Sequence, residues 1–320
     1  MALMDIPAGS AAAATSGFAG PWFLSPRFEQ ELRERDLTGE QERQVRDFAA
    51  NGYLVLESTG LDDFDQIAGG IQAELAPLHE EGRFNRVENA WETCPSVRAL
   101  ATAPGLIELL TLLHGRRPIP FQTLNFRKGT EQKTHSDAVH FHCFPKHLMC
   151  GVWVALEDTD ESNGTLHYYP GSHLLPDIEY ADLGLRPGKD FYPRYEAYVE
   201  ELIEARGLRR ERPSLHRGQA VIWAANLLHG GDAIADPART RLSQVTHFYF
   251  EDCSYYTPLR SDLARGKVWF RQIRDVTTGR LVPSRVGGRR IPVPLSSRAV
   301  TLQRSLLRRL GRPAVRRFPV

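Results

Sequence analysis

Residues 149–156 read Met149-Cys150-Gly151-Val152-Trp153-Val154-Ala155-Leu156. This short apolar run, with its β-branched and aromatic residues, is typical of a buried β-strand. Similar runs lie at 121–127, 165–169, 219–224 and 243–250. Turn signals separate them, including Asn163-Gly164, Pro170-Gly171 and Arg217-Gly218. Because no long helices intervene, the pattern favours a sandwich or jelly roll over a parallel α/β sheet, and we expect a jelly-roll core over residues 119–250.

A helical layer is predicted before this core, over residues 37–115. Its first helix begins at Thr38, because Thr38 as N-cap and Gln41 three residues later form a capping box. Gly52 supplies the left-handed residue at which this helix ends. The further elements expected there are a strand at 53–56 and helices at 63–78 and 96–114, the last broken at Pro104. The expected fold class is therefore mainly β with flanking helices (α+β).

The chain divides into a short leader, one domain and a basic tail. Residues 1–20 are rich in alanine and glycine and are predicted to be a mobile leader. Residues 21–275 are predicted to form a single domain. Within it, the charged stretch 177–212 reads as an insertion between strands, with a helix near 195–205. Its aromatic residues suit either a lid over an apolar ligand or an amphipathic helix packed on the core. These aromatic residues are Phe191, Tyr192, Tyr195 and Tyr198.

Composition narrows the class of protein. The 320 residues are 42% hydrophobic and 25% charged, which is ordinary for a soluble globular protein. We see no apolar run close to the ~20 residues of a membrane span, and the N-terminus lacks the pattern of a signal peptide. Four cysteines form neither a CxxC pair nor a disulfide framework. A reduced, cytoplasmic protein without a membrane segment is expected.

The basic extension over residues 276–320 contains eleven arginines, no lysine and no acidic residue. Since the whole chain carries +1 and this tail +11, residues 1–275 carry −10. A basic tail on an acidic body could dock on an acidic carrier protein. The alternative is a general compositional bias toward arginine. Nucleic acid is not expected as a partner, because the tail lacks interleaved aromatic residues and no groove-reading motif precedes it.

The first candidate for chemistry is His135-Ser136-Asp137. In an extended segment, residues i and i+2 project from one face, so this imidazole and carboxylate can converge on one point. Two histidines and one carboxylate hold a ferrous ion while leaving positions open for a co-substrate and dioxygen. Taken alone, the pattern also fits an ordinary surface ion pair.

A second histidine is needed on a strand brought alongside the first. His229 fits, because the apolar run that starts at Gln219 ends just before it. Two glycines, Gly230 and Gly231, let the backbone come close to a ligand. The alternative is a buried structural histidine.

A cation for an acidic co-substrate is the third component. Arg241 lies at the start of the strand that follows the loop after His229. A guanidinium grips a carboxylate through two parallel hydrogen bonds. Strand alternation places Ser243 on the same face, so both residues could contact one carboxylate. Arg239 has the same parity and is the rival.

Taken together in this order, these motifs resemble the phytanoyl-CoA dioxygenase family. The resemblance spans about residues 37–250; the 177–212 insertion and the chain after residue 258 lie outside it. It rests on the following segments: the 37–56 opening, His135-Ser136-Asp137, Trp153-Val154-Ala155-Leu156, Asn163-Gly164-Thr165-Leu166, Tyr169-Pro170-Gly171-Ser172-His173, His229 and Arg241. The resemblance implies an Fe(II)- and 2-oxoglutarate-dependent oxygenase on a double-stranded β-helix, which is a cupin-like jelly roll.

The resemblance also implies roles for individual residues. His135, Asp137 and His229 would bind iron, and Arg241 would hold the distal carboxylate of 2-oxoglutarate, with Ser243 as a second donor. Trp153 would lie near the co-substrate, unless it is only a core tryptophan. The remaining candidates are Gln122 and Asn125 as hydrogen-bond partners of 2-oxoglutarate, and His140, Phe141 and His142 as substrate-side residues.

The carboxylate at Asp137 narrows the reaction, because related halogenases carry a small residue at this position. The expected activity is hydroxylation of a small organic metabolite, such as one of secondary metabolism. Dioxygen would be consumed, and 2-oxoglutarate would be decarboxylated to succinate and carbon dioxide. Desaturation, cyclisation or epimerisation with the same cofactor is the alternative outcome. A non-catalytic metal-binding jelly roll and a zinc hydrolase are the alternatives from other classes.

Overall fold

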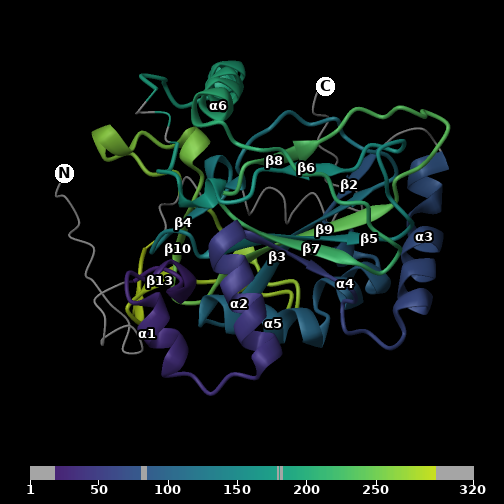
Figure 1. Cartoon of the computed structure of the whole chain (residues 1–320), viewed down its shortest axis with the longest axis horizontal. Helices are drawn as coiled ribbons and strands as arrows, with labels where there is room; N and C mark the ends of the chain where they lie inside the picture. Colours follow the sequence, from purple (N-terminus) through teal and green to yellow (C-terminus); the bar gives the residue numbers. More distant parts are fainter. Residues whose placement is uncertain (1–18, 81–84, 179, 181–182, 293–320) are drawn as a thin grey trace.

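The core of the molecule is a six-stranded antiparallel sheet, seen in Figure 1. The computed structural model describes residues 19–80, 85–178, 180 and 183–292. The strands run in the order β1 (Tyr53–Leu56), β7 (Ala220–Ala224), β5 (Met149–Ala155), β9 (Ser243–Phe250), β3 (Pro118–Phe126) and β2 (Arg86–Glu88). The apolar run at 149–156 thus contains β5, which pairs with β7 on one side and β9 on the other. All seven residues of β5 are buried, as the apolar composition of this strand predicted.

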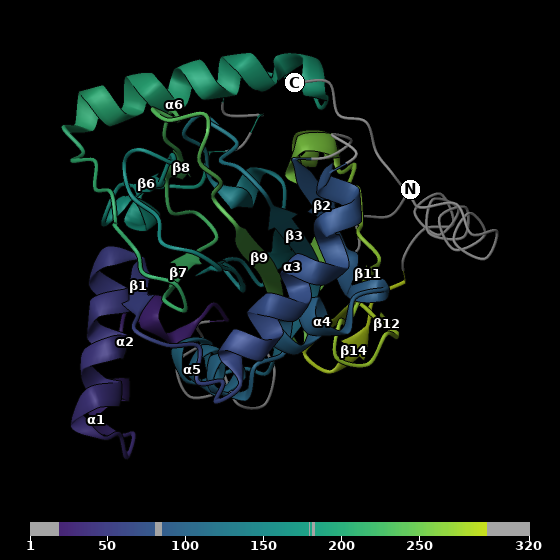
Figure 2. The ribbon, with the colours of Figure 1, turned by 90° about the vertical axis from the view of Figure 1, so that its right-hand side faces the viewer.

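Helices cover one face of this sheet, as Figures 1 and 2 show. They are η1 (Trp22–Leu24), α1 (Phe28–Arg33), α2 (Gly39–Asn51), α3 (Phe64–Glu80), α4 (Pro95–Ala101) and α5 (Pro104–His114), with the short η2 (Ala90–Glu92). The capping box of α2 is confirmed: Thr38 Oγ1 accepts from the Gln41 backbone N–H at 3.2 Å, and the Gln41 side chain accepts from the Thr38 N–H at 3.0 Å. Gly52 ends the helix with a φ of 79° and leads directly into β1.

Smaller strand pairs lie over the opposite face. β6 (Leu166–Tyr168) pairs with β8 (His229–Gly231), and β4 (His142–Phe144) pairs with β10 (Ser254–Tyr256). A core of aromatic and aliphatic residues fills the space between the main sheet and β6, with Trp153, Tyr168 and Trp223 among its members. The long helix α6 (Tyr192–Arg206) lies above β6 and β8 and is buried against them through Tyr195 and Val199 (Figure 2).

The connecting segments contain short 3₁₀ turns and hairpins. The turns are η3 (Asp137–Val139), η4 (Ser172–Leu174), η5 (Lys189–Phe191), η6 (Pro258–Arg260) and η7 (Leu263–Arg265). Two C-terminal hairpins are β11 (Ile273–Arg274) with β12 (Leu281–Val282), and β13 (Arg285–Val286) with β14 (Arg289–Arg290). Packing continues past the domain end predicted at residue 275, because Val276 is fully buried and its N–H donates to Pro120 O at 2.8 Å. The predicted leader up to residue 18 and the arginine-rich stretch from residue 293 lie outside the described residues.

The stretch Pro95–His114 is long and apolar enough to pass as a membrane span by length and composition alone. We had expected no stretch to pass that test. In the structure it forms two helices, α4 and α5, and Pro104 begins the second. Their apolar side chains are buried in the helical core: Val97, Leu100, Leu106, Leu110 and Leu113. Core packing therefore accounts for the apolar composition of this stretch.

His114 at the end of α5 makes the helical layer sensitive to acid. Its ring is enclosed by Phe23, Phe48 and Phe250, and burial lowers the pKa of His114 from its ordinary 6.5 to about 3. The unfolded state therefore binds a proton below pH 6.5 that the folded state excludes. Stability is complete above that pH and falls below it, by about 2 kcal/mol between about pH 7 and about pH 5.

We predict that the free energy of unfolding falls less between about pH 7 and about pH 5 in His114→Phe than in the wild type, by about 2 kcal/mol. The phenylalanine keeps an aromatic ring in place but cannot titrate. Denaturant unfolding of both proteins at each pH measures it. Other buried histidines contribute equally to both proteins, so equal slopes for variant and wild type would show that His114 is not the group responsible.

Candidate metal centre

Three predicted donors meet at one point between the main sheet and β8. His135, Asp137 and His229 each offer an atom within 4.8 Å of the others. Asp137 Oδ1 lies 3.8 Å from His135 Nε2, and Asp137 Oδ2 lies 3.8 Å from His229 Nε2. All three residues are buried. Side chains far apart in the sequence therefore form one compact donor set.

The local backbone explains how they meet. Ser136 is extended, with φ −113° and ψ 144°, so His135 and Asp137 project to the same side before η3 begins at Asp137. His135 and His229 form an antiparallel bridge in which each N–H donates to the carbonyl oxygen of the other at 2.9 Å. This bridge places β8 beside the segment that carries the other two donors.

Both imidazoles are oriented by backbone carbonyls. His135 Nδ1 lies 2.9 Å from Lys133 O, and His229 Nδ1 lies 3.0 Å from Leu227 O. Each Nδ1–H donates to its carbonyl, which leaves Nε2 as an acceptor; that of His135 lies 3.1 Å from the side-chain nitrogen of Gln132. Burial and the neighbouring His229 lower the pKa of His135 to about 3, so this imidazole is neutral at neutral pH. A neutral, oriented imidazole is what metal binding requires.

Asp137 is held as a carboxylate. The Trp223 indole N–H donates to Asp137 Oδ2 at 2.8 Å, and His247 Nε2 lies 3.5 Å from the same oxygen. Burial by itself raises the pKa of Asp137, but the facing imidazoles of His247, His229 and His135 outweigh it and bring that pKa below its usual value. Asp137 is thus an ionised, hydrogen-bonded ligand candidate.

Trp223 owes its position to a glycine on the neighbouring strand. Trp223 of β7 pairs with Gly151 of β5, and a Cβ added at Gly151 would lie 2.3 Å from the indole ring. The absence of a side chain at Gly151 therefore lets the indole lie flat across β5 and reach Asp137. Neither Trp223 nor His247 was predicted as a site residue. For His247 the available signal was strand alternation, since it shares parity with the predicted Ser243 on β9.

A second polar centre lies at Arg241. Arg241 is 2% exposed, and its Nη1 donates to Gly164 O at 2.6 Å. Among the described residues its Nε has no hydrogen-bond partner, and no carboxylate forms an ion pair with it. Burial lowers the pKa of Arg241 to about 10, which still leaves it charged at neutral pH. A buried cation without a counter-ion is costly, so this site suits an anionic ligand.

Trp153 and Ser243 border this cation. Arg241 Cζ lies 5.8 Å from the centroid of the Trp153 ring, and the indole N–H of Trp153 is also buried without a partner in the described part of the chain. Ser243 is fully buried at the start of β9, with Oγ 3.5 Å from Arg241 O. The rival Arg239 is engaged elsewhere: it forms a partly exposed ion pair with Asp160 at 2.8 Å. The structure therefore favours Arg241 as the cation with capacity for a ligand.

The two polar candidates on β3 point in different directions. Gln122 lies between His247 and Glu88, accepting from His247 Nδ1 at 3.0 Å and donating to Glu88 at 2.8 Å. Asn125 instead donates to Gln244 at 3.0 Å, and Gln244 bonds to the Val97 carbonyl of α4. Asn125 therefore faces the helical layer and not the donor set, contrary to its expected role beside 2-oxoglutarate.

The three expected substrate-side residues also divide. The His140 ring lies 6.1 Å from that of His135, and the Phe141 ring lies 4.9 Å from that of His247, so both border the donor set. His142 turns away, stacks on Tyr256 and faces Asp177 at 3.7 Å. Its ring therefore lies on the side of Tyr256 and Asp177 and not beside the donor set.

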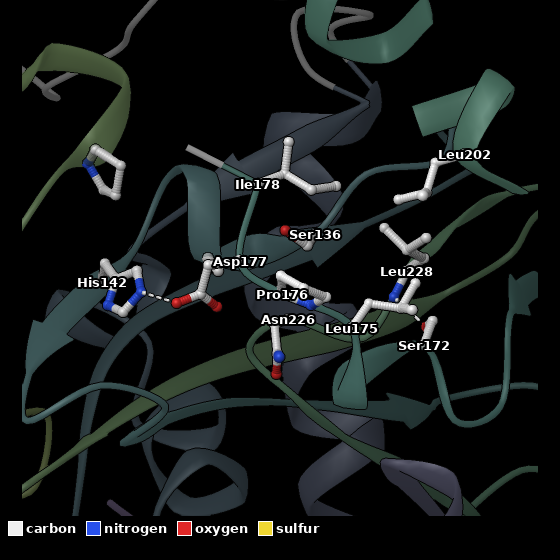
Figure 3. Close-up of a pocket in the computed structure, with 12 residues that line it drawn as sticks. Ser136, His142, Ser172, Leu175, Pro176, Asp177, Ile178, Leu202, Asn226 and Leu228 are labelled. Atoms are coloured by element: carbon white, nitrogen blue, oxygen red, sulfur yellow. Dashed lines mark hydrogen bonds and ion pairs between the residues drawn. The ribbon is translucent and has the colours of Figure 1, made fainter. Parts of the chain in front are cut away.

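His142 lines a crevice that Figure 3 shows, together with Asp177 and Asn226. Polar atoms of all three are buried there without hydrogen-bond partners in the described residues. The crevice has a volume of about 20 Å³, which is room for a water molecule and too little for an organic substrate. It also lies behind the donor set, because it is bordered by Ser136 and Ala138, the residues on either side of Asp137.

The donor set identifies the class of ion. Two imidazoles and one carboxylate, in a buried site with nitrogen and oxygen donors only, suit a divalent transition metal such as ferrous iron or zinc. A mainly β fold with helical layers and this donor set defines a protein that could hold one such ion.

The backbone at Gly230, which the sequence predicts to approach a ligand, instead approaches His167 and Gln132, since a Cβ there would lie 2.6 Å from Gln132 O.

Residues 62–241 match the model of the phytanoyl-CoA dioxygenase (PhyH) family, which is more than half of the chain. The chain belongs to this family, as its motifs predicted. Family membership supports oxygenase chemistry that depends on iron and 2-oxoglutarate.

Curated relatives include the zebrafish (Danio rerio) phytanoyl-CoA dioxygenase domain-containing protein 1, 27% identical over 150 residues. That match covers 44% of this chain and 52% of the relative. The rat (Rattus norvegicus) peroxisomal phytanoyl-CoA dioxygenase is 26% identical over 160 residues, covering 48% of this chain and 42% of the relative. The chain thus spans about half the length of these relatives.

Solved structures share the fold. The non-heme alpha ketoglutarate dependent epimerase SnoN from nogalamycin biosynthesis aligns with a TM-score of 0.52 at 24% identity, over 68% of this chain and 83% of SnoN. The carbocyclase SnoK from the same biosynthesis aligns with a TM-score of 0.53 at 18% identity, over 72% and 90%. EctD from S. alaskensis with bound Fe aligns with a TM-score of 0.52 at 19% identity, over 71% and 81%.

We predict that Trp223→Phe weakens metal binding about tenfold, because Asp137 loses the indole N–H that orients it. The measurement is an anaerobic Fe(II) titration against a chelating indicator. Gly151→Ala should weaken binding in the same direction, since its methyl group displaces the indole. Trp269→Phe, a change at a partly exposed tryptophan, is the matched control. Wild-type affinity in Trp223→Phe would mean that the hydrogen bond does not hold the carboxylate in place.

Proposed function

We propose that this protein is an Fe(II)- and 2-oxoglutarate-dependent dioxygenase that hydroxylates a small organic metabolite. The observation that carries the proposal is the presence, on one face of the main sheet, of a buried His-Asp-His donor set and of the buried Arg241, which has no carboxylate partner among the described residues. The first suits a ferrous ion and the second an anion. A co-substrate that chelates metal at one end and carries a carboxylate at the other satisfies both.

The residues that would hold the iron are His135, Asp137 and His229. When bound, the ion with 2-oxoglutarate and dioxygen supplies the oxidising power, and 2-oxoglutarate is decarboxylated to succinate and carbon dioxide. The chain contributes geometry: carbonyl oxygens fix the imidazole tautomers, and the Trp223 N–H fixes one carboxylate oxygen of Asp137. Burial of all three donors keeps bulk water away from the site.

Strand geometry supports a short dicarboxylate as the second ligand. Arg241 lies over Trp153, and Asp137 is held by the indole that lies over Gly151. Trp153 and Gly151 are two residues apart on β5, which corresponds to about 7 Å along the strand. A five-carbon dicarboxylate can bridge the two centres. Its distal carboxylate would accept from Arg241 Nε and from the Trp153 indole N–H, neither of which has a hydrogen-bond partner in the described residues, with Ser243 close by.

The double-stranded β-helix belongs to the same proposal. The main sheet and the β6–β8 pair enclose an aromatic core, and the donor set lies at the edge of that core. This arrangement supports a jelly roll in which the strands of one sheet position the co-substrate. Both sheets together would then position the metal.

Hydroxylation is the proposed outcome of the reaction. His140 and Phe141 border the donor set on the side where a substrate would approach. Solved structures of similar fold include an epimerase and a carbocyclase, so epimerisation, cyclisation or desaturation is the alternative to hydroxylation. A small free metabolite is the proposed substrate. Exposed arginines on the C-terminal hairpins would suit an acidic carrier if the substrate is carrier-bound: Arg280, Arg285, Arg289 and Arg290.

We expect Asp137→Ala to abolish the formation of succinate from 2-oxoglutarate, because the metal loses its only anionic protein ligand. Succinate is measured with Fe(II) and dioxygen, first without substrate and then with compounds that perturb the anaerobic spectrum of the Fe(II)·2-oxoglutarate complex. A product one oxygen heavier than its substrate supports hydroxylation, whereas the loss of two hydrogens or an unchanged mass supports the alternatives. Succinate formation at the wild-type rate in Asp137→Ala would remove Asp137 from the ligand set.

Arg241→Leu is expected to raise the concentration of 2-oxoglutarate needed for half-maximal turnover at least about tenfold, because a charge-assisted, two-point contact is lost. Arg239→Leu is the matched control: it has the same strand parity, but its guanidinium is already paired with Asp160. The dependence of succinate formation on 2-oxoglutarate measures both. The opposite pattern, with Arg239→Leu raising the requirement and Arg241→Leu leaving it unchanged, would transfer the anchoring role to Arg239.

A further inference from the structure

Helix α6 lies directly against the segment that carries two of the metal donors. Tyr195 is fully buried, and its hydroxyl oxygen accepts from the Ser136 backbone N–H at 3.0 Å. The same hydroxyl lies 3.3 Å from Ser136 Oγ. Ser136 is the residue between His135 and Asp137, so a side chain of the helix contacts the backbone between the two ligands.

The geometry of Ser136 lets this contact hold the backbone that carries His135 and Asp137. Because Ser136 is extended, its side chain projects away from His135 and Asp137. Accordingly Ser136 lines the crevice behind the donor set, beside Leu202 of α6 and Leu228 (Figure 3). The segment is thus held on two sides, by the bridge from His135 to His229 and by the Tyr195 hydroxyl.

A second tyrosine of the same helix contacts the site. The Tyr192 hydroxyl lies 3.1 Å from His140 Nε2, and the rings of Tyr192 and Tyr195 stack at 5.5 Å. The apolar residues around Tyr195 come from α6, from the stretch after Asp137 and from the stretch before His229: Val199, Val139 and Leu228. One face of α6 is therefore packed on the chain around all three donors.

A hydroxyl in such an apolar cluster is unfavourable unless it is hydrogen-bonded. Its partner here is the backbone N–H of the buried, extended Ser136, which has no backbone partner among the described residues. Removing the hydroxyl leaves this N–H unsatisfied and frees the peptide between the donors to shift. The hydrogen bond thus stabilises the position of the ligand segment more than it stabilises the helix.

We propose that Tyr195 is a positioning residue for the metal-ligand segment, through which the docking of α6 and the binding of metal stabilise each other. This inference rests on the proposed function only in that His135, Asp137 and His229 hold a divalent ion. Coupling of this kind is reciprocal: a docked helix raises metal affinity, and bound metal raises the stability of the docked helix. The insertion at 177–212 then helps to position the metal donors, in addition to covering the strands below it.

The first test compares Tyr195→Phe with Tyr198→Phe in the full-length protein. Each change removes one hydroxyl from the same helix, but Tyr198 is 36% exposed. Anaerobic titration with Fe(II) alone, against a chelating indicator, should show about tenfold weaker binding for Tyr195→Phe and wild-type binding for Tyr198→Phe. Equal affinities for wild type and Tyr195→Phe would overturn the inference.

The second test begins with the wild-type protein. Hydrogen exchange of the wild-type protein, with and without Fe(II) under anaerobic conditions, should show slower exchange of α6 amides when metal is bound. In Tyr195→Phe this protection should be smaller. A purely structural role would lower thermal stability without changing either readout, which contradicts the inference. Failure of the wild type to bind metal would overturn the proposed function as well, so the two failures are distinguishable.

Discussion

The buried carboxylate of Asp137 is the constraint around which this molecule is arranged. A carboxylate taken out of water is costly unless charges and hydrogen bonds compensate it. Here the compensation comes from elements far apart in the chain: an indole from β7, an imidazole from β8 and another from β9. Residue 151 of β5 is a glycine, because a Cβ at this position would overlap with the indole ring. A divalent cation among these groups would complete the compensation of the carboxylate charge. The buried polar groups around Asp137 therefore suit a metal site.

Arg241 is the complementary constraint. A cation and an anion lie on one face of the main sheet, yet they do not pair with each other, because apolar residues separate them: Val221 and Val245 lie in the same core cluster as Trp153. The guanidinium has no carboxylate partner among the described residues, whereas the Asp137 carboxylate is compensated by imidazoles and the Trp223 indole. A buried cation on the same face as a metal-donor set favours a ligand that presents an anion to the guanidinium and lone pairs to a metal.

Local sequence determined what could be predicted. The capping box at Thr38 and Gln41 and the left-handed Gly52 depend on residues within a few positions, and the structure has them as expected. The same holds for His135 and Asp137, which share a face in any extended segment. Trp223 and His247 escaped notice because their importance depends on which strands pair, and pairing is a long-range property. Asn125 is a different case: it lies three positions from Gln122, so alternation alone places the two on opposite faces. Arg239 and Arg241 share parity, and only the loop around Asp160 distinguishes them.

The tyrosines of α6 show how an inserted element can become part of a site. An amphipathic helix that merely covered the sheet would need only apolar residues on its inner face. Phenylalanine would fill the space of Tyr195 without bringing a polar atom into an apolar cluster. The hydroxyl is accounted for by its bond to Ser136, and the Tyr192 hydroxyl by its bond to His140. Both partners belong to the stretch that begins with the first metal donor. Variation in such an insertion would therefore alter what is covered and also how firmly the donors are held.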